Sequence, residues 1–119
     1  MVSPPEFEKA VLPHGTTAVI ADPHEIGNVS GCQGIDYMLE ATAGLDLDVF
    51  IMMPSCVPST GLDESGAVLG AADIKPYYDN PRILGLAEVM DSVGVVGGME
   101  DLLDKIGEAA HRDKVIDGH

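Results

Sequence analysis

Four short apolar runs, separated by segments with helical spacing, restrict most strongly how this chain can fold. The runs cover residues 16–21, 48–53, 82–90 and 114–117. The first two are apolar at nearly every position rather than at alternate ones, which is typical of parallel strands buried on both faces. Strands and helices therefore alternate along the chain. This order predicts a parallel α/β sheet with short, right-handed connections.

The first helix is expected at the start of the chain. Ser3 is a candidate N-cap, prolines follow in the first turn, and Glu6 stands three residues after Ser3, which is a capping-box pattern. Phe7, Ala10 and Val11 then fall on one helical face.

Three further helices are predicted between the strands. They cover 31–44, 70–81 and 97–112, and the second is expected to be short because Pro76 interrupts it. Helical spacing predicts that the inward positions are Ile35, Met38, Leu39 and Thr42 in the first of these segments and Leu102, Leu103, Ile106 and Ala110 in the last.

The acidic composition argues against binding to nucleic acid or to an anionic membrane surface. The 119 residues include 20 Asp and Glu against 6 Lys and Arg, a formal net charge of −14. No stretch reaches the roughly 20 apolar residues of a membrane span, and the N-terminus lacks the basic head and apolar core of a signal peptide. A cytoplasmic protein is expected, with Cys32 and Cys56 as free thiols.

Polar side chains follow every predicted strand. Because the carboxyl ends of parallel strands meet at one rim, these residues are expected to converge there, as in an enzyme. The residues at these positions are Asp22, His24 and Glu25 after the first strand, Pro54, Ser55 and Cys56 after the second, Glu88 at the end of the third, and Asp117 and His119 after the fourth, so each strand end offers at least one polar or ligand-type residue.

Each candidate also has a purely structural interpretation. Asp22 or Glu25 could cap the following helix while His24 packs, or His24 and Glu25 could act as an acid–base pair or as metal ligands. Glu88 either reaches solvent at a strand end or is buried and needs a cation, a donor or a proton. His119 is either an uninformative tail or a metal ligand directly after a parallel strand.

Four stretches together resemble the adenine deaminases of the amidohydrolase superfamily. They are VLPHGTTAVIADPHEIGNV, IMMPSCVPST, LGLAEVM and VIDGH, in order and over nearly the whole chain. The resemblance implies a metal-dependent (β/α)8 barrel of the TIM type. It also implies hydrolytic deamination of adenine to hypoxanthine and ammonia, in purine salvage. The implied two-metal site holds manganese or iron, with zinc as a third candidate.

The resemblance also implies roles for individual residues. Glu88 matches the carboxylate that bridges the two metals, and His119 matches a metal-ligand histidine after barrel strand five. His24 and Glu25 match an active-site pair that either transfers protons or forms an accessory metal position. The loop that contains Ser55 and Cys56 is expected to help form the purine pocket. The DSVGVV stretch after Glu88 departs from the family's usual Asn-Phe-Pro-Gly type of turn.

The resemblance covers about half of a barrel, from helix one to strand five. A complete barrel takes roughly 250 residues. The superfamily's His-x-His pair would lie before Met1, and a further histidine and the catalytic aspartate would lie beyond His119. Residues 1–119 are therefore expected to be a partial amidohydrolase catalytic domain with negligible activity alone. Its two unpaired sheet edges are expected to favour homo-oligomers.

Two other functions stay open at this point. The chain could come from a related amidohydrolase that acts on another purine or on a cyclic amide. It could also be a non-catalytic, acidic α/β module that binds a partner or a cation.

Overall fold

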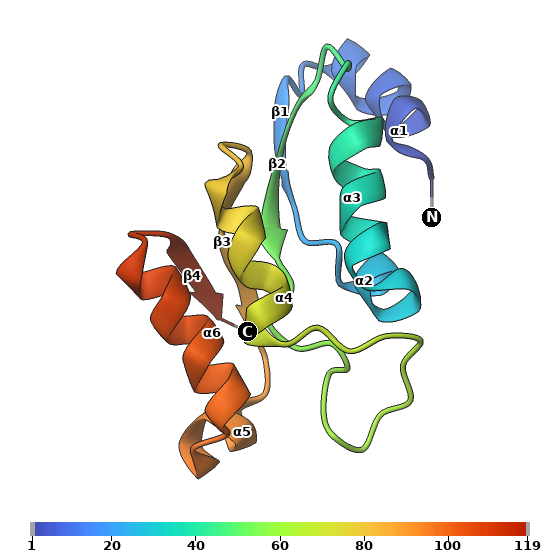
Figure 1. The fold of residues 1–119 in the computed structure, drawn as a ribbon. Coiled ribbons are helices and arrows are strands. Elements are labelled where there is room, and N and C mark those ends of the chain that lie inside the picture. Colours follow the sequence, from blue (N-terminus) through green and yellow to red (C-terminus); the bar gives the residue numbers. More distant parts are fainter. Residues whose placement is uncertain (1, 119) are drawn as a thin grey trace.

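Four parallel strands form one curled sheet in the computed structural model, which describes residues 2–118 (Figure 1). The strands are β1 (Ala18–Ala21), β2 (Asp48–Met53), β3 (Ile83–Val89) and β4 (Val115–Gly118), and they lie side by side in chain order. Each strand pairs in parallel with the next. The curled sheet is a half-barrel, which confirms the predicted α/β fold as part of a TIM-type barrel.

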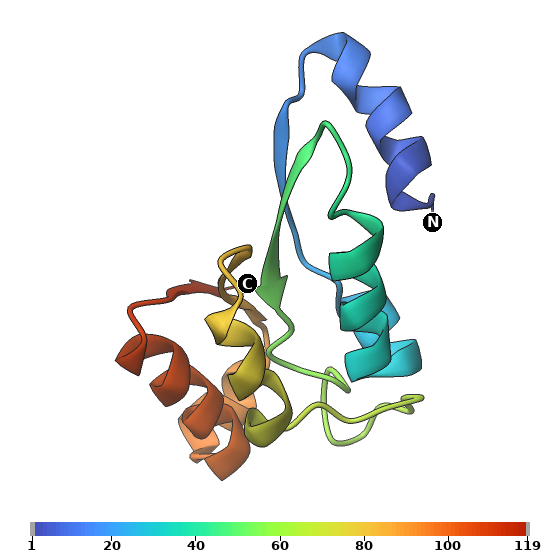
Figure 2. The same ribbon diagram turned by 45° about the horizontal axis from the view of Figure 1, so that its top comes forward.

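Helices lie between the strands in sequence and flank them in space. Figure 2 shows α1 to α3 beside β1 and β2, and α4 to α6 beside β3 and β4. The helical elements are α1 (Pro4–Val11), η1 (Leu12–His14), α2 (His24–Ser30), α3 (Cys32–Ala41), α4 (Ala71–Ile74), η2 (Lys75–Asp79), α5 (Ser92–Gly97) and α6 (Glu100–His111).

Two of these helices, α2 and α5, are absent from the sequence-based prediction. Both are short and glycine-containing, so neither shows an apolar stripe of helical period. The Asp91 side chain caps α5, because its Oδ1 accepts a hydrogen bond of 2.8 Å from the Gly94 amide. Helix α2 packs against the protein through Gly27, which is buried near the side chains of Pro54, Val57 and Leu69.

The first helix forms where predicted, but its details differ. Ser3 occupies the N-cap position without a side-chain cap, and Glu6 instead pairs with Lys9 at 2.6 Å. Phe7 and Ala10 are exposed, whereas Val11 packs against the core. The capping-box interpretation is therefore wrong.

The inward face of α6 also differs from the prediction. The buried positions are Leu102, Lys105 and Ala109, whereas Leu103 and Ala110 are exposed. The helix is rotated so that a lysine, rather than Leu103, faces the body of the protein. In α3 the predicted face is confirmed, with Ile35 and Thr42 buried and with Met38 and Leu39 partly buried.

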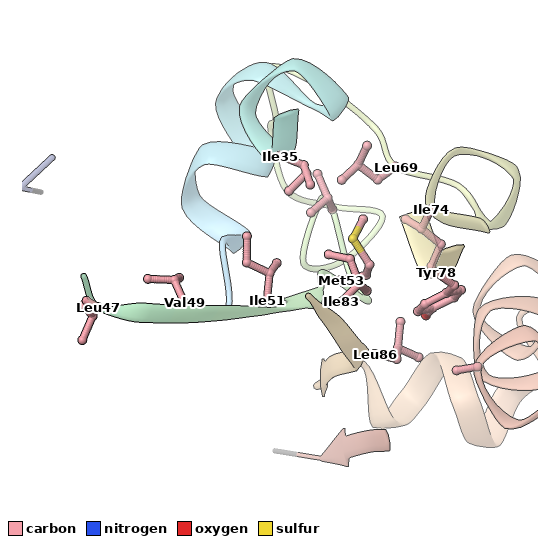
Figure 3. Packing of buried hydrophobic residues seen from close by; sticks show 12 residues of the cluster. Ile35, Leu47, Val49, Ile51, Met53, Leu69, Ile74, Tyr78, Ile83 and Leu86 are labelled. Carbon is pink, nitrogen blue, oxygen red and sulfur yellow. The ribbon is translucent and has the colours of Figure 1, made fainter. Parts of the chain in front are cut away.

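The core lies between the sheet and the helices. Figure 3 shows Val49, Ile51 and Met53 pointing from β2 toward the helical side, where Ile35 and Leu69 meet them. Their burial fixes the position of the strand ends that follow. The outer strands are poorly covered: Ile20 in β1 is 65% exposed, and every residue of β4 is exposed.

No helix within residues 2–118 is long and apolar enough to cross a membrane. Cys32 and Cys56 are free thiols, as expected from the sequence.

Candidate active site

The end of β1 carries a partly buried carboxylate–histidine pair. Asp22 Oδ1 lies 2.5 Å from His24 Nδ1, and the two side chains are 24% and 12% exposed. Helix α2 begins at His24, with Pro23 at the N-cap and no side-chain cap. The structure therefore uses neither Asp22 nor Glu25 as the cap of α2. Glu25 is exposed and lines a hollow together with Asp22 and Met38 of α3, whereas the partner of His24 is Asp22.

Three atoms of this pair are buried and have no hydrogen-bond partner within residues 2–118, namely both carboxylate oxygens of Asp22 and His24 Nε2. A buried polar atom without a partner costs about 1–3 kcal/mol, so such atoms mark places where a ligand, an ion or a proton is expected. A carboxylate close to Nδ1 of a histidine orients the ring, so that its Nε2 can face a ligand. This arrangement is typical of histidines that bind a metal or transfer a proton.

The loop after β2 is tied to the end of β3. Ser55 is fully buried, and its hydroxyl donates a hydrogen bond of 2.5 Å to the backbone carbonyl of Glu88. Its oxygen also lies 3.2 Å from Cys56 Sγ. Cys56 is buried as well and lines, with Val57 and Leu69, a cavity of about 160 Å³. The structure thus brings two of the predicted strand ends together.

Glu88 is the penultimate residue of β3 and is partly exposed. The strand is irregular here, because Leu86 pairs with Ile116 but Val89 pairs with Gly118, which leaves one extra residue on β3. Such a bulge changes the direction of a side chain and is frequent beside active sites. Gly118 is the last described residue, and the predicted ligand His119 lies outside the described part of the chain.

The donor atoms at these strand ends are oxygens and nitrogens from Asp22, His24 and Glu88, which suit manganese, iron or zinc. Within residues 2–118, however, no group of three or more His, Cys, Asp or Glu side chains is arranged to hold a metal ion. The chemistry of the donors fits a divalent metal, but the described residues supply only part of a ligand set.

Sequence reasoning missed Lys105, whose side chain is 5% exposed. Its Nζ donates a hydrogen bond of 3.0 Å to the Ser55 carbonyl and lies 2.8 Å from Asp101 Oδ2. Burial acts to raise the pKa of Asp101, but hydrogen bonds from Lys105 and from the Ala71 amide outweigh it, so the pKa is lowered. The signal was present in the sequence, because residue 105 shares a helical face with Leu102 and Ala109.

No model of a known protein family matches the chain. Curated proteins named adenine deaminase are similar to it from end to end. Those of Bacillus velezensis, Bacillus pumilus and Bacillus subtilis are 56%, 55% and 52% identical over all 119 residues. The chain spans 21% of the length of each of these relatives. It is therefore homologous to one segment of a much longer protein.

Proposed function

We propose that this chain is a segment of an adenine deaminase and contributes part of its catalytic domain, which hydrolyses adenine to hypoxanthine and ammonia. The observation that carries the proposal is the similarity to adenine deaminases over the whole chain. The half-barrel supports it, because enzymes of this fold place their chemistry at the carboxyl ends of the strands. Asp22, Ser55 and Glu88 stand at or directly after such ends.

The proposal assigns Glu88 and His119 as metal ligands in a site for manganese or iron, with zinc as a third candidate. A bound divalent metal would lower the pKa of water, so that hydroxide is available near neutral pH. The oxygen and nitrogen donors support this choice of metals. The chain alone is expected to deaminate adenine negligibly, since the described residues hold no complete ligand set.

His24 and Glu25 are proposed to transfer protons or to form an accessory metal position. For His24 the support is its buried Nε2, which has no hydrogen-bond partner within residues 2–118. Ser55 and Cys56 are proposed to shape the purine pocket, because both line the cavity beside α6.

A cytoplasmic location and self-association complete the proposal. The two free thiols are compatible with a reducing compartment. Both outer strands leave an edge unpaired within residues 2–118, and Val115 of β4 is 60% exposed. Such edges favour pairing with another chain. Sedimentation of the purified chain is expected to give dimers or larger assemblies, and a monodisperse monomer would contradict this.

The activity is tested by a chimera in which this chain replaces the corresponding segment of the Bacillus subtilis adenine deaminase. We expect the chimera to release ammonia from adenine, and Glu88→Gln to abolish that release. Glu100→Gln is the matched control, because Glu100 is exposed on α6. A folded chimera without activity, or an active Glu88→Gln chimera, would contradict the proposal.

Metal analysis separates the ligand role of Glu88 from catalysis. Manganese and iron are measured per molecule in the chimera, in the chain alone and in their Glu88→Gln variants. We expect the chimera to retain metal and to lose it on Glu88→Gln. Equal metal content in the chimera and its variant would remove Glu88 from the ligand set. Metal in the chimera but not in the chain alone would mean that the site needs residues outside 1–119.

A further inference from the structure

At the end of β3 the regular backbone pairing to both neighbouring strands is interrupted. The last register pair between β2 and β3 is Met53 with Leu86, and toward β4 the register shifts between Leu86 and Val89. Glu88 lies inside this irregular stretch. The direction of its side chain therefore depends on contacts other than a regular ladder.

Beyond the last register pair of β2 and β3, a side-chain hydrogen bond joins the loop after β2 to β3. The Ser55 hydroxyl donates to the Glu88 carbonyl at 2.5 Å, and Ser55 is completely buried. Ser55 belongs to an irregular loop without helix or strand structure of its own. This bond can hold Glu88 in place only if the loop itself is held.

Lys105 holds that loop from the opposite side. Its Nζ reaches across from α6 to the Ser55 carbonyl at 3.0 Å. Burying an ammonium group is costly unless it is paired and hydrogen-bonded. Here Asp101 provides the charge at 2.8 Å, and the Ala71 amide in turn donates a hydrogen bond to Asp101 at 2.8 Å. Thus α6 and β3 both bond to Ser55, and α4 supports the carboxylate that pairs with Lys105.

We propose that Lys105 is a positioning residue, which fixes the end of β3, and with it Glu88, through Ser55. The link runs from the Lys105 ammonium to the Ser55 carbonyl and from the Ser55 hydroxyl to the Glu88 carbonyl. The inference rests on the proposed function, because it gives Lys105 a role in holding a metal ligand. Lys105 does not touch the metal or the substrate in this scheme.

Amide hydrogen exchange of the chain itself tests the link without metal or substrate. Lys105→Met keeps the length of the side chain and removes the ammonium, and Ser55→Ala removes the hydroxyl. Lys75→Met is the matched control, because Lys75 is 57% exposed and pairs with Glu108 at 3.3 Å. Peptides covering 84–91 report on the end of β3, and peptides covering 48–53 report on the sheet as a whole.

Both variants are expected to exchange about tenfold faster over 84–91, as for the loss of one net hydrogen bond. Exchange over 48–53 should be unchanged, and Lys75→Met should behave like the parent chain. The double variant should equal the more affected single variant, because both changes interrupt one link. A uniform acceleration, unchanged exchange over 84–91, or a Lys105→Met chain that does not fold would make Lys105 a core residue and overturn the proposal.

The manganese affinity of the chimera tests whether the link from Lys105 through Ser55 to Glu88 supports metal binding. In the chimera, Lys105→Met should weaken manganese binding at least tenfold, as is typical when a group that supports a metal ligand is removed. Lys75→Met should leave the affinity unchanged. If the parent chimera binds none of manganese, iron and zinc, the proposed function fails, whereas the exchange data still decide whether Lys105 fixes the end of β3.

Discussion

Gly85 allows β3 and β4 to pair, and replacing it with alanine should detach β4. A Cβ at this position would lie 1.9 Å from the Val115 carbonyl oxygen, whereas ordinary contacts begin at 3.4 Å. The strands would have to separate by 1.5 Å, the difference between 3.4 and 1.9 Å. Backbone hydrogen bonds do not survive such a displacement.

The free-energy cost of Gly85→Ala follows from the hydrogen bonds between β3 and β4 that are lost. Three register pairs join β3 to β4. At about 1 kcal/mol for each net hydrogen bond, one bond per pair amounts to about 3 kcal/mol. All residues of β4 are exposed, so little apolar burial opposes the detachment. The rest of the half-barrel should stay folded, because its core lies between β1 to β3 and the helices.

Amide exchange measures this effect directly. In Gly85→Ala, peptides covering 114–118 should exchange about a hundredfold faster, since 1.4 kcal/mol corresponds to a factor of ten. Peptides covering 48–53 should be nearly unchanged. Gly107→Ala is the control, because nothing lies within 4 Å of a Cβ there, and it should stabilise α6 by about 0.5–1 kcal/mol. Unchanged protection over 114–118 in Gly85→Ala would refute the argument.

Two further predictions concern stability. Arg82→Met should lower the free energy of unfolding in urea by about 1.5–3 kcal/mol, because Arg82 donates to Thr42 Oγ1 at 2.7 Å and to the Leu39 carbonyl; an unchanged midpoint would contradict this. Burial raises the pKa of Tyr78 to about 12 from 10.0, so its contribution to stability is complete below pH 10 and is lost as the pH rises toward about 12. Tyr78→Phe should therefore lose less stability than the parent over that range. It should cost little at pH 7, because the Tyr78 hydroxyl has no hydrogen-bond partner within residues 2–118; equal alkaline loss in both chains would contradict the assignment.

Local periodicity predicted much of the fold. The strand at 48–53 has the predicted bounds, and all four predicted inward positions of α3 are buried or partly buried. Both segments have a clear apolar pattern, and such patterns decide which face is buried. For α6 the pattern was misleading, because a buried lysine takes a position that hydrophobicity assigns to the surface. Its burial depends on Ser55, which is distant in the sequence.

In the candidate site, too, the sequence predicted some features and only the tertiary structure decided the others. Parallel strands bring their carboxyl ends to one rim, so the order of the strands was enough to predict that Asp22, His24, Ser55 and Glu88 follow strand ends or stand at them. Only the tertiary structure decided that His24 pairs with Asp22, that the Ser55 hydroxyl bonds to the Glu88 backbone and that Lys105 supports this loop.

The physical reason is the range of the interactions. The chain by itself determined which segments become strands or helices, since periodicity and turn residues act over a few neighbouring positions. The hydrogen bond of Ser55 with Glu88 joins residues that are 33 positions apart, and the bond of Ser55 with Lys105 joins residues that are 50 positions apart. Both bonds form only when packing sets the rotation of α6 and the bulge in β3. Those two features belong to the tertiary structure alone.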